Sequence, residues 1–95
     1  MVTRTFTIIA YDISSDKLRT RLSNYLLRFG LRANYSVFEC MLTDRQYTQI
    51  KQSIPQIINE KTDRVLLYQL CKSCYIRSER LGKADELPTD TIIEI

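Results

Sequence analysis

The chain of 95 residues contains no histidine. This absence excludes a ribonuclease that uses paired histidines as general acid and base. It also removes the base that usually activates a serine or cysteine nucleophile. We therefore interpret Ser14 and Ser15 as helix-capping residues and not as nucleophiles.

Glycine, proline and long apolar runs are also scarce. Two glycines and two prolines, with 44% hydrophobic and 26% charged residues, are typical of a folded protein and not of a disordered, collagen-like or membrane protein. No run approaches the roughly 18 apolar residues that span a bilayer, and the N-terminus lacks the pattern of a signal peptide. We expect one small cytoplasmic domain with no membrane contact, short enough to gain stability from a partner.

The three cysteines are Cys40, Cys71 and Cys74. An odd number without an export signal argues against a disulfide framework. Cys71 and Cys74 form a CxxC pair that is half of a zinc site, but a structural zinc site normally has four Cys or His ligands. A redox role would require the strand-to-helix setting of a thioredoxin-like fold, whereas this pair lies between two expected strands. We expect the pair to serve packing and turn geometry.

Acidic residues concentrate at the C-terminus. Residues 84–95 carry four acids and no base, so residues 1–83 hold all 14 bases against seven acids. A body this positive attracts polyanions such as nucleic acids through counterion release. Moderately basic domains without a nucleic-acid role are equally common, so charge alone leaves both interpretations open.

Runs of β-branched and aromatic residues predict the strands. The first is residues 5–12, the second 33–42 and the third 63–70. A more polar segment, 75–81, predicts a further strand. After an acidic, turn-rich linker, residues 91–95 predict a last short strand.

Two helices are predicted by apolar periodicity and capping residues. Ser14 or Ser15 begins the first, Asp16 favours its first turn and Gly30 is the expected C-terminal cap. Its apolar stripe consists of Leu18, Leu22, Tyr25, Leu26 and Phe29.

The second predicted helix begins with Thr43 and Gln46, which fit a capping box. Pro55 disfavours the helical conformation at Ile54, so we expect a kink or an early end there.

We interpret these elements as a ferredoxin-like α+β fold, βαββαβ with an additional short C-terminal strand. Two helices can cover only one face of its sheet. The first strand nevertheless alternates Phe6 and Ile8 with Ile9 and Tyr11, so both faces are apolar. We infer that the second face is buried against another chain, most simply in a twofold homodimer with sheet facing sheet.

Three separated motifs resemble the CRISPR-associated protein 2 family. They are YDIS at residues 11–14, GLRANYSVFEC at 30–40, and LYQLCKSC followed by RLG within 67–82. Their order and spacing match the family over nearly the whole chain. The resemblance implies a ferredoxin-like domain over residues 1–82. Residues 83–95 would form a linker and a C-terminal strand that can join the partner subunit's sheet.

The same resemblance implies a role in spacer acquisition for prokaryotic adaptive immunity. In that role the homodimer bridges dimers of the CRISPR-associated integrase and helps to bind double-stranded DNA. Several members of the family are described as metal-dependent endonucleases that act on single-stranded RNA or on DNA. Others are described as scaffolds that need no catalytic activity. Both alternatives stay open, and a third is a toxin-type ribonuclease on the same fold.

Asp12 ends the first strand, at the position of the family's proposed catalytic aspartate. One carboxylate is a poor Mg²⁺ site, because Mg²⁺ takes about six oxygens, usually from one or two carboxylates, waters and substrate phosphates. A twofold axis near the strand end would pair Asp12 with Asp12 of the second subunit. A metal between them would polarise a phosphate and activate water. The alternative is that Asp12 caps the turn formed by residues 13–15.

A second group of residues is expected to bind nucleic acid. Lys17, Arg21 and Arg28 fall within about 40° of one another on the first helix, forming a basic ridge suited to a duplex backbone. Such a ridge is also compatible with simple solvation. By resemblance, the residues near the active site or nucleic-acid surface are Tyr11, Arg19, Arg21, Arg32 and Phe38. For Phe38, packing is favoured over base stacking.

Overall fold

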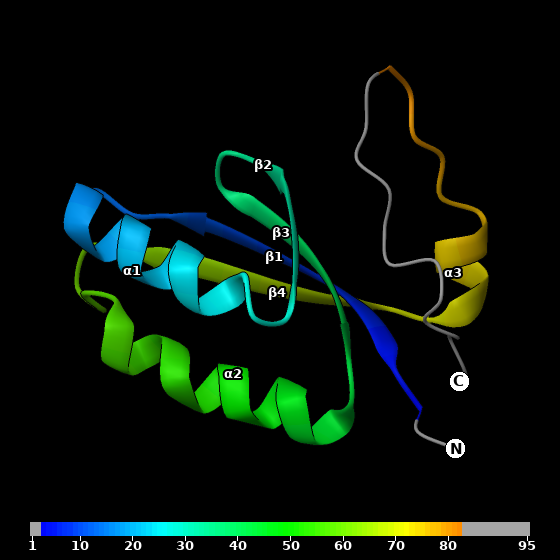
Figure 1. The fold of residues 1–95 in the computed structure, drawn as a ribbon, viewed down its shortest axis with the longest axis horizontal. Coiled ribbons are helices and arrows are strands. Elements are labelled where there is room, and N and C mark those ends of the chain that lie inside the picture. The colour runs from blue at the N-terminus through cyan, green and yellow to red at the C-terminus, as the bar shows by residue number, and fades with distance from the viewer. Residues whose placement is uncertain (1–2, 83–95) are drawn as a thin grey trace.

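The computed structural model describes residues 3–82, which form an antiparallel sheet with two helices on one face (Figure 1). In chain order the elements are β1 (Thr5–Asp12), α1 (Asp16–Leu26), β2 (Gly30–Asn34), β3 (Val37–Leu42), α2 (Asp44–Ile57), β4 (Arg64–Leu70) and α3 (Lys72–Ile76). The strands lie in the order β2-β3-β1-β4, which confirms the ferredoxin-like α+β fold. The predicted linker and C-terminal strand lie outside the described residues.

The first helix begins where its capping residues predict but ends earlier. Ser15 is the N-cap, and its hydroxyl accepts a hydrogen bond from the Leu18 backbone N–H at 3.3 Å. The helix ends at Leu26 with Leu27 as its C-cap in the right-handed helical conformation. The prediction that Gly30 caps this helix is therefore wrong.

Gly30 instead opens β2, opposite Cys40 of β3. A Cβ atom at Gly30 would collide with the Glu39 carbonyl oxygen and the Cys40 side chain. Glycine is thus required by the close approach of two strands and not by a left-handed cap. Residues 33–42, predicted as one strand, belong to a hairpin with a register shift between Arg32 and Asn34.

The second helix confirms the predicted capping box. The Thr43 hydroxyl accepts from the Gln46 N–H at 3.1 Å, and the Gln46 side chain accepts from the Thr43 N–H at 3.0 Å. Pro55 lies inside the helix, which continues to Ile57, so of the expected kink or early end at Ile54 the early end does not occur. Pro55 falls in the last turn, where its missing N–H removes one helical hydrogen bond while buried Ile54 keeps the turn packed on the core.

The predicted strand over residues 75–81 is wrong. The chain leaves the edge strand β4 and forms the short helix α3, followed by an irregular segment to residue 82. Tyr75 of α3 packs against Phe6 of β1, with ring centroids 4.7 Å apart. This contact places α3 on the sheet face that carries Phe6, where Tyr75 is half-buried.

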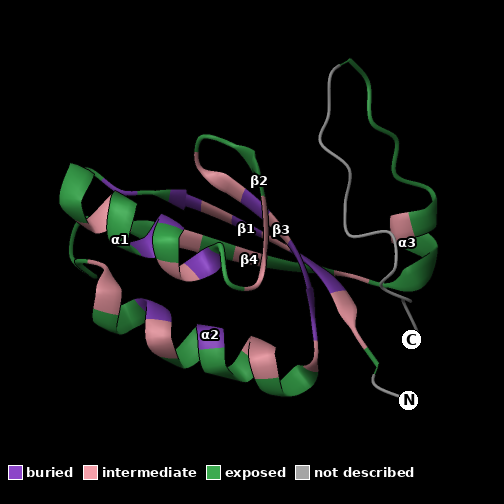
Figure 2. Ribbon diagram, in the orientation of Figure 1, coloured by how far each residue is buried: buried purple, intermediate pink, exposed green. Residues whose placement is uncertain are grey.

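The main core lies between the sheet and the helices α1 and α2. Figure 2 shows the buried residues concentrated in β1, β3 and the inner sides of these helices. Each fully buried Leu, Ile or Phe side chain stabilises the fold by about 1.5–3 kcal/mol. The residues with no exposed surface include Ile9, Leu22, Leu26, Phe38 and Ile50. Among the described helices, none is long and apolar enough to cross a membrane.

Candidate nucleic-acid and metal site

The face of the sheet opposite α1 and α2 is the open face. Alternation along β1 places Phe6, Ile8, Ala10 and Asp12 on this face, since Ile9 and Tyr11 belong to the helix-side core. Residues directly opposite in an antiparallel ladder share a face, so Leu66 and Tyr68 of β4 also point there. They are 43% and 51% exposed. The expected second apolar face therefore exists.

Asp12 is the exposed last residue of β1. Arg64, the first residue of β4, lies directly opposite it in the ladder. Both side chains line a shallow pocket of about 250 Å³ together with Ala10, Tyr11 and Leu66. A carboxylate and a guanidinium thus flank the same small hollow at one end of the open face, where the guanidinium can bind a phosphate in bidentate fashion.

The turn after Asp12 is held by other residues. Ser15 caps α1, and the Arg19 guanidinium donates to the Ile13 carbonyl oxygen at 2.9 Å and pairs with Asp16. Within the described part of the chain, no hydrogen bond or ion pair engages the Asp12 carboxylate. The alternative that Asp12 caps this turn is not what the structure shows, and its oxygens are available to a ligand.

One copy of the chain does not fit a resident metal ion. No group of three or more Cys, Asp or Glu side chains suited to a metal occurs among residues 3–82. Asp12 supplies a single carboxylate with a cation opposite it. The donor set becomes suitable for Mg²⁺ only when a second copy adds its own carboxylate and a substrate adds phosphate oxygens.

Both aromatic residues expected at a nucleic-acid surface are buried on the helix side of the sheet. Phe38 has no exposed surface, and Tyr11 is 6% exposed. The Tyr11 hydroxyl donates to the Tyr35 carbonyl oxygen at 3.4 Å. Base stacking on Phe38 would require the core to open, so the structure supports the packing interpretation of this residue.

Arg32 and Arg28 each lie over an aromatic ring. The Arg32 guanidinium lies 5.7 Å from the centre of the Phe38 ring and donates to the Ser23 hydroxyl. Arg28 lies 5.9 Å from the centre of the Tyr25 ring. These contacts hold both cations on the helix side of the sheet, where each remains exposed.

The predicted basic ridge is only partly a helical feature. Lys17 and Arg21 are exposed on α1, but Arg28 follows the end of the helix at Leu26. This surface and the Asp12 pocket lie on opposite faces of the sheet, because α1 covers the face that Asp12 does not share. The structure therefore separates the predicted site residues into two surfaces.

Arg64 is a candidate site residue that the sequence interpretation missed. The alternation along β4 would have found it, because Arg64 continues the series Leu66, Tyr68 and Leu70 on the open face. What the pattern alone does not provide is the register with β1. That register, set by pairing across the sheet, places Arg64 beside Asp12.

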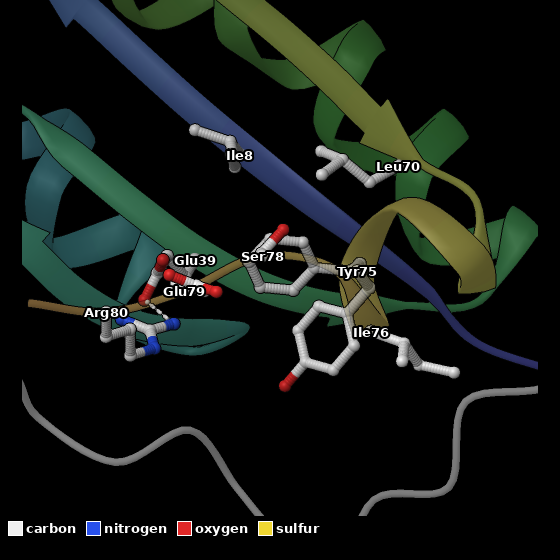
Figure 3. A pocket seen from close by; sticks show the side chains of 9 residues that line it. Ile8, Glu39, Leu70, Tyr75, Ile76, Ser78, Glu79 and Arg80 are labelled. Atoms are coloured by element: carbon white, nitrogen blue, oxygen red, sulfur yellow. Dashed lines mark hydrogen bonds and ion pairs between the residues drawn. The ribbon is translucent and has the colours of Figure 1, made fainter.

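A larger cavity of about 590 Å³ lies at the other end of the open face. Figure 3 shows Tyr75 and Ile76 of α3 at one side and Arg80 near Glu39 at the other. Arg80 pairs with Glu39 at 2.7 Å, and the Glu39 side chain is only 15% exposed. The segment after β4 thus covers this end of the sheet while the Asp12 end stays open.

The fold is that of a small ferredoxin-like protein with its candidate site on the sheet face that α1 and α2 leave open. The family model described as CRISPR associated protein Cas2 matches residues 5–77. A CRISPR-associated endoribonuclease Cas2 from Chloroflexus aurantiacus is 38% identical over 91 residues, covering 95% of this chain and 96% of the relative. The chain belongs to the Cas2 family.

Solved structures agree with this assignment. The crystal structure of Streptococcus pyogenes Cas2 matches with a TM-score of 0.71 and 33% identity, covering 81% of this chain and 99% of that one. A chain of a partial Cas6-RT-Cas1–Cas2 complex matches with a TM-score of 0.69 and 31% identity, covering 81% and 84%. Both structural matches cover most of the residues that the structure describes.

Proposed function

We propose that the protein acts in CRISPR spacer acquisition as a homodimer that binds nucleic acid and cleaves it with Mg²⁺ at a site shared by two Asp12 carboxylates. The observation that carries this proposal is the position of Asp12. It is an exposed carboxylate without a partner in the described chain, at the end of a central strand, beside Arg64 and on the open face. Curated relatives named as endoribonucleases support the choice of reaction.

The open face supports the dimer. Leu66 and Tyr68 expose large apolar surfaces between the Asp12 pocket and the segment of α3. A second copy related by a twofold axis would bury the same patch on both chains. With the axis near the end of β1, the two Asp12 side chains would face each other, and the site would be complete only in the dimer.

Within this site the protein's own residues bind and orient the substrate. Arg64 would hold a phosphate through paired N–H donors, which places the scissile group beside the carboxylates. Bound Mg²⁺ would supply Lewis acidity and a nucleophilic water. Lys17 and Arg21 would contact the backbone of a longer duplex on the other face of the molecule without reading its sequence.

The second candidate function is a non-catalytic scaffold that bridges integrase dimers and binds duplex DNA. One observation favours it. This chain matches a chain of a solved partial Cas6-RT-Cas1–Cas2 complex over 81% of its length. In either case we expect the protein to work in the prokaryotic cytoplasm, where its integrase partner and DNA meet.

Asp12→Asn separates the two functions, because it removes the charge and nearly preserves the shape. Purified wild type and variant are incubated with labelled single-stranded RNA or double-stranded DNA, with Mg²⁺ or with EDTA. Asp44→Asn is the matched control, since Asp44 is an exposed aspartate at the start of α2, at the opposite end of the sheet. Dimerisation and nucleic-acid binding are measured on the same samples.

The catalytic proposal expects Mg²⁺-dependent cleavage by wild type and Asp44→Asn and at least about a hundredfold less by Asp12→Asn, the range seen when a catalytic electrostatic group is removed. All three proteins should dimerise and bind nucleic acid. If none of them cleaves while all bind DNA, the scaffold function stands. If Asp12→Asn cleaves as fast as wild type, the shared carboxylate site is refuted.

A further inference from the structure

The CxxC pair lies at a junction between a strand and a helix. β4 ends at Leu70, Cys71 is the N-cap of α3, and Cys74 lies within that helix. The expectation that the pair lies between two strands is therefore wrong, and so is the reason for setting aside redox chemistry. A strand-to-helix CxxC is the arrangement in which thioredoxin-like proteins place a reactive dithiol.

The thiols of Cys71 and Cys74 are exposed, unlike those of cysteines that pack in a core. Cys71 and Cys74 are both exposed, whereas Cys40 is buried with 1% of its surface accessible. The Cys74 backbone N–H donates to the Cys71 sulfur at 3.4 Å, and the Ser73 hydroxyl lies 3.1 Å from the same sulfur. The first turn of α3 therefore wraps around the Cys71 sulfur and holds Cys74 next to it.

These contacts make the two thiols unequal. Hydrogen bonds from Ser73 and Cys74 lower the pKa of Cys71 to about 7, and proximity to Cys71 raises the pKa of Cys74. Burial raises the pKa of Cys40 to about 12. Near neutral pH about half of Cys71 is thiolate, the form that attacks a disulfide. An attacking thiol with a pKa near the ambient pH reacts fastest.

We propose that Cys71 and Cys74 form a redox-active dithiol that is converted reversibly to an intramolecular disulfide by exchange with a small-molecule disulfide. Cys71 is the attacking thiol and Cys74 the resolving thiol. A single-chain metal site is the competing use of the pair. It lacks its remaining ligands, because residues 3–82 contain no cluster of three metal-binding side chains.

The exchange balances in two steps. The Cys71 thiolate attacks one sulfur of the small disulfide, forms a mixed disulfide and expels one thiolate. Cys74 then loses its proton and attacks the Cys71 sulfur, which forms the Cys71–Cys74 bond and expels the second thiolate. The protein gives up two electrons and two protons, and the small disulfide becomes two thiols.

The disulfide would act on the part of the open face that α3 covers. Tyr75 follows Cys74 directly, and its ring packs on Phe6. A bond from the N-cap to the third helical residue closes the turn that presents Tyr75 to the sheet. Oxidation would therefore hold α3 more firmly on the open face. After reduction, α3 and the segment that follows it would be held there by Tyr75 and by the Arg80–Glu39 ion pair.

The test exposes fully reduced protein to glutathione disulfide at neutral pH and follows each cysteine by mass spectrometry after trapping free thiols. Wild type should lose two hydrogens, with the bond mapped to Cys71–Cys74. Cys74→Ser should stop at a glutathione adduct on Cys71. Cys71→Ser should form its adduct on Cys74 severalfold more slowly, because Cys71 is the thiol whose pKa is lowered and which is therefore more often a thiolate. Cys40 is the internal control and should stay unmodified in all three.

Four results would contradict the proposal. The first is a stable glutathione adduct on wild type, which would show that Cys74 does not resolve it. The second is a disulfide between chains, seen on a non-reducing gel. The third is zinc bound in proportion to the Cys71–Cys74 pair and lost in both serine variants, which would assign the pair to a metal shared between copies. Equal reaction rates of Cys71 and Cys74 would contradict the assigned roles in the same way.

Discussion

Asp12 and Arg64 lie directly opposite each other at the end of the β1–β4 ladder, on the sheet face that α1 and α2 leave open. One residue ends a strand and the other begins one, and 51 residues of chain separate them. Because antiparallel partners share a face, the pairing brings an anion and a cation to the rim of one pocket. The candidate site therefore depends on the register between β1 and β4.

Arg64→Ala should weaken nucleic-acid binding by about tenfold, because one charge-assisted contact to a phosphate is lost. The slope of the logarithm of the binding constant against the logarithm of salt concentration should fall by about one phosphate contact. Titrations at several salt concentrations measure both. Arg45→Ala is the control, since Arg45 is exposed on α2. Equal losses in the two variants would indicate a general charge effect.

Leu66→Asp should weaken the proposed homodimer by about a hundredfold or more. The substitution removes an apolar contact of about 1.5–3 kcal/mol on each side of a twofold interface and adds two charges to it. Leu66 is 43% exposed on the open face, and Leu27, 53% exposed just after α1, provides the control Leu27→Asp. Sedimentation over a range of concentrations measures the dissociation constant. An unchanged dimer in Leu66→Asp would place the interface elsewhere.

Ile50→Ala should lower the free energy of unfolding by about 2–5 kcal/mol, because it leaves a cavity beneath α2 in the core. Ile50 has no exposed surface. Ile76→Ala removes the same atoms from a side chain that is 67% exposed, and its effect should stay within about 0.5 kcal/mol. Urea unfolding of both variants gives the comparison. A small loss for Ile50→Ala would mean that the core relaxes to fill the space.

The buried thiol of Cys40 should make the protein less stable in alkali. Burial and the charge of Glu39 raise its pKa from the usual 9.0 to about 12, so the folded state keeps its proton where the unfolded state loses it. The free energy of unfolding should therefore be unaffected by this group below about pH 9 and fall by about 1.4 kcal/mol per pH unit from there to about pH 12.

Cys40→Ala removes this group and isolates its contribution from other titrating residues. The variant should be less stable than wild type at neutral pH, and the difference should shrink as the pH rises above about 9. Urea unfolding at neutral pH and near pH 10 provides the values. Parallel curves for the two proteins would show that Cys40 ionises as easily in the folded state as in the unfolded one.

Local patterns were sufficient for much of the fold. Ser15 and the Thr43–Gln46 capping box marked the starts of α1 and α2, because a cap depends on residues within one helical turn. Alternation in β1 and β4 identified two apolar faces, because successive side chains of one strand point to opposite faces of the sheet. The three motifs that resemble the family also lie within single segments of the chain, and the family match confirms that resemblance.

Other features depended on contacts between distant segments. The hairpin of β2 and β3 requires Gly30 because Glu39 and Cys40 approach it closely. The sequence predicts a strand over residues 75–81, but Tyr75 lies in the short helix α3 and packs against Phe6 across the sheet. The CxxC pair also lies at the start of α3, with Cys71 as its N-cap. The spacing of the two cysteines alone does not predict this helix start.

The sequence by itself determined the strands β1 and β4, the N-terminal caps of both main helices, the excess of positive charge and Asp12 as an exposed carboxylate at a strand end. Only the tertiary structure decided that Arg64 is its neighbour, that Phe38 and Tyr11 are buried, and that Cys71 and Cys74 are exposed at the start of α3. The physical reason is the separation along the chain of the residues that interact. Caps and alternation are interactions between near neighbours in the chain, whereas register and burial are set when segments far apart in the sequence pack together.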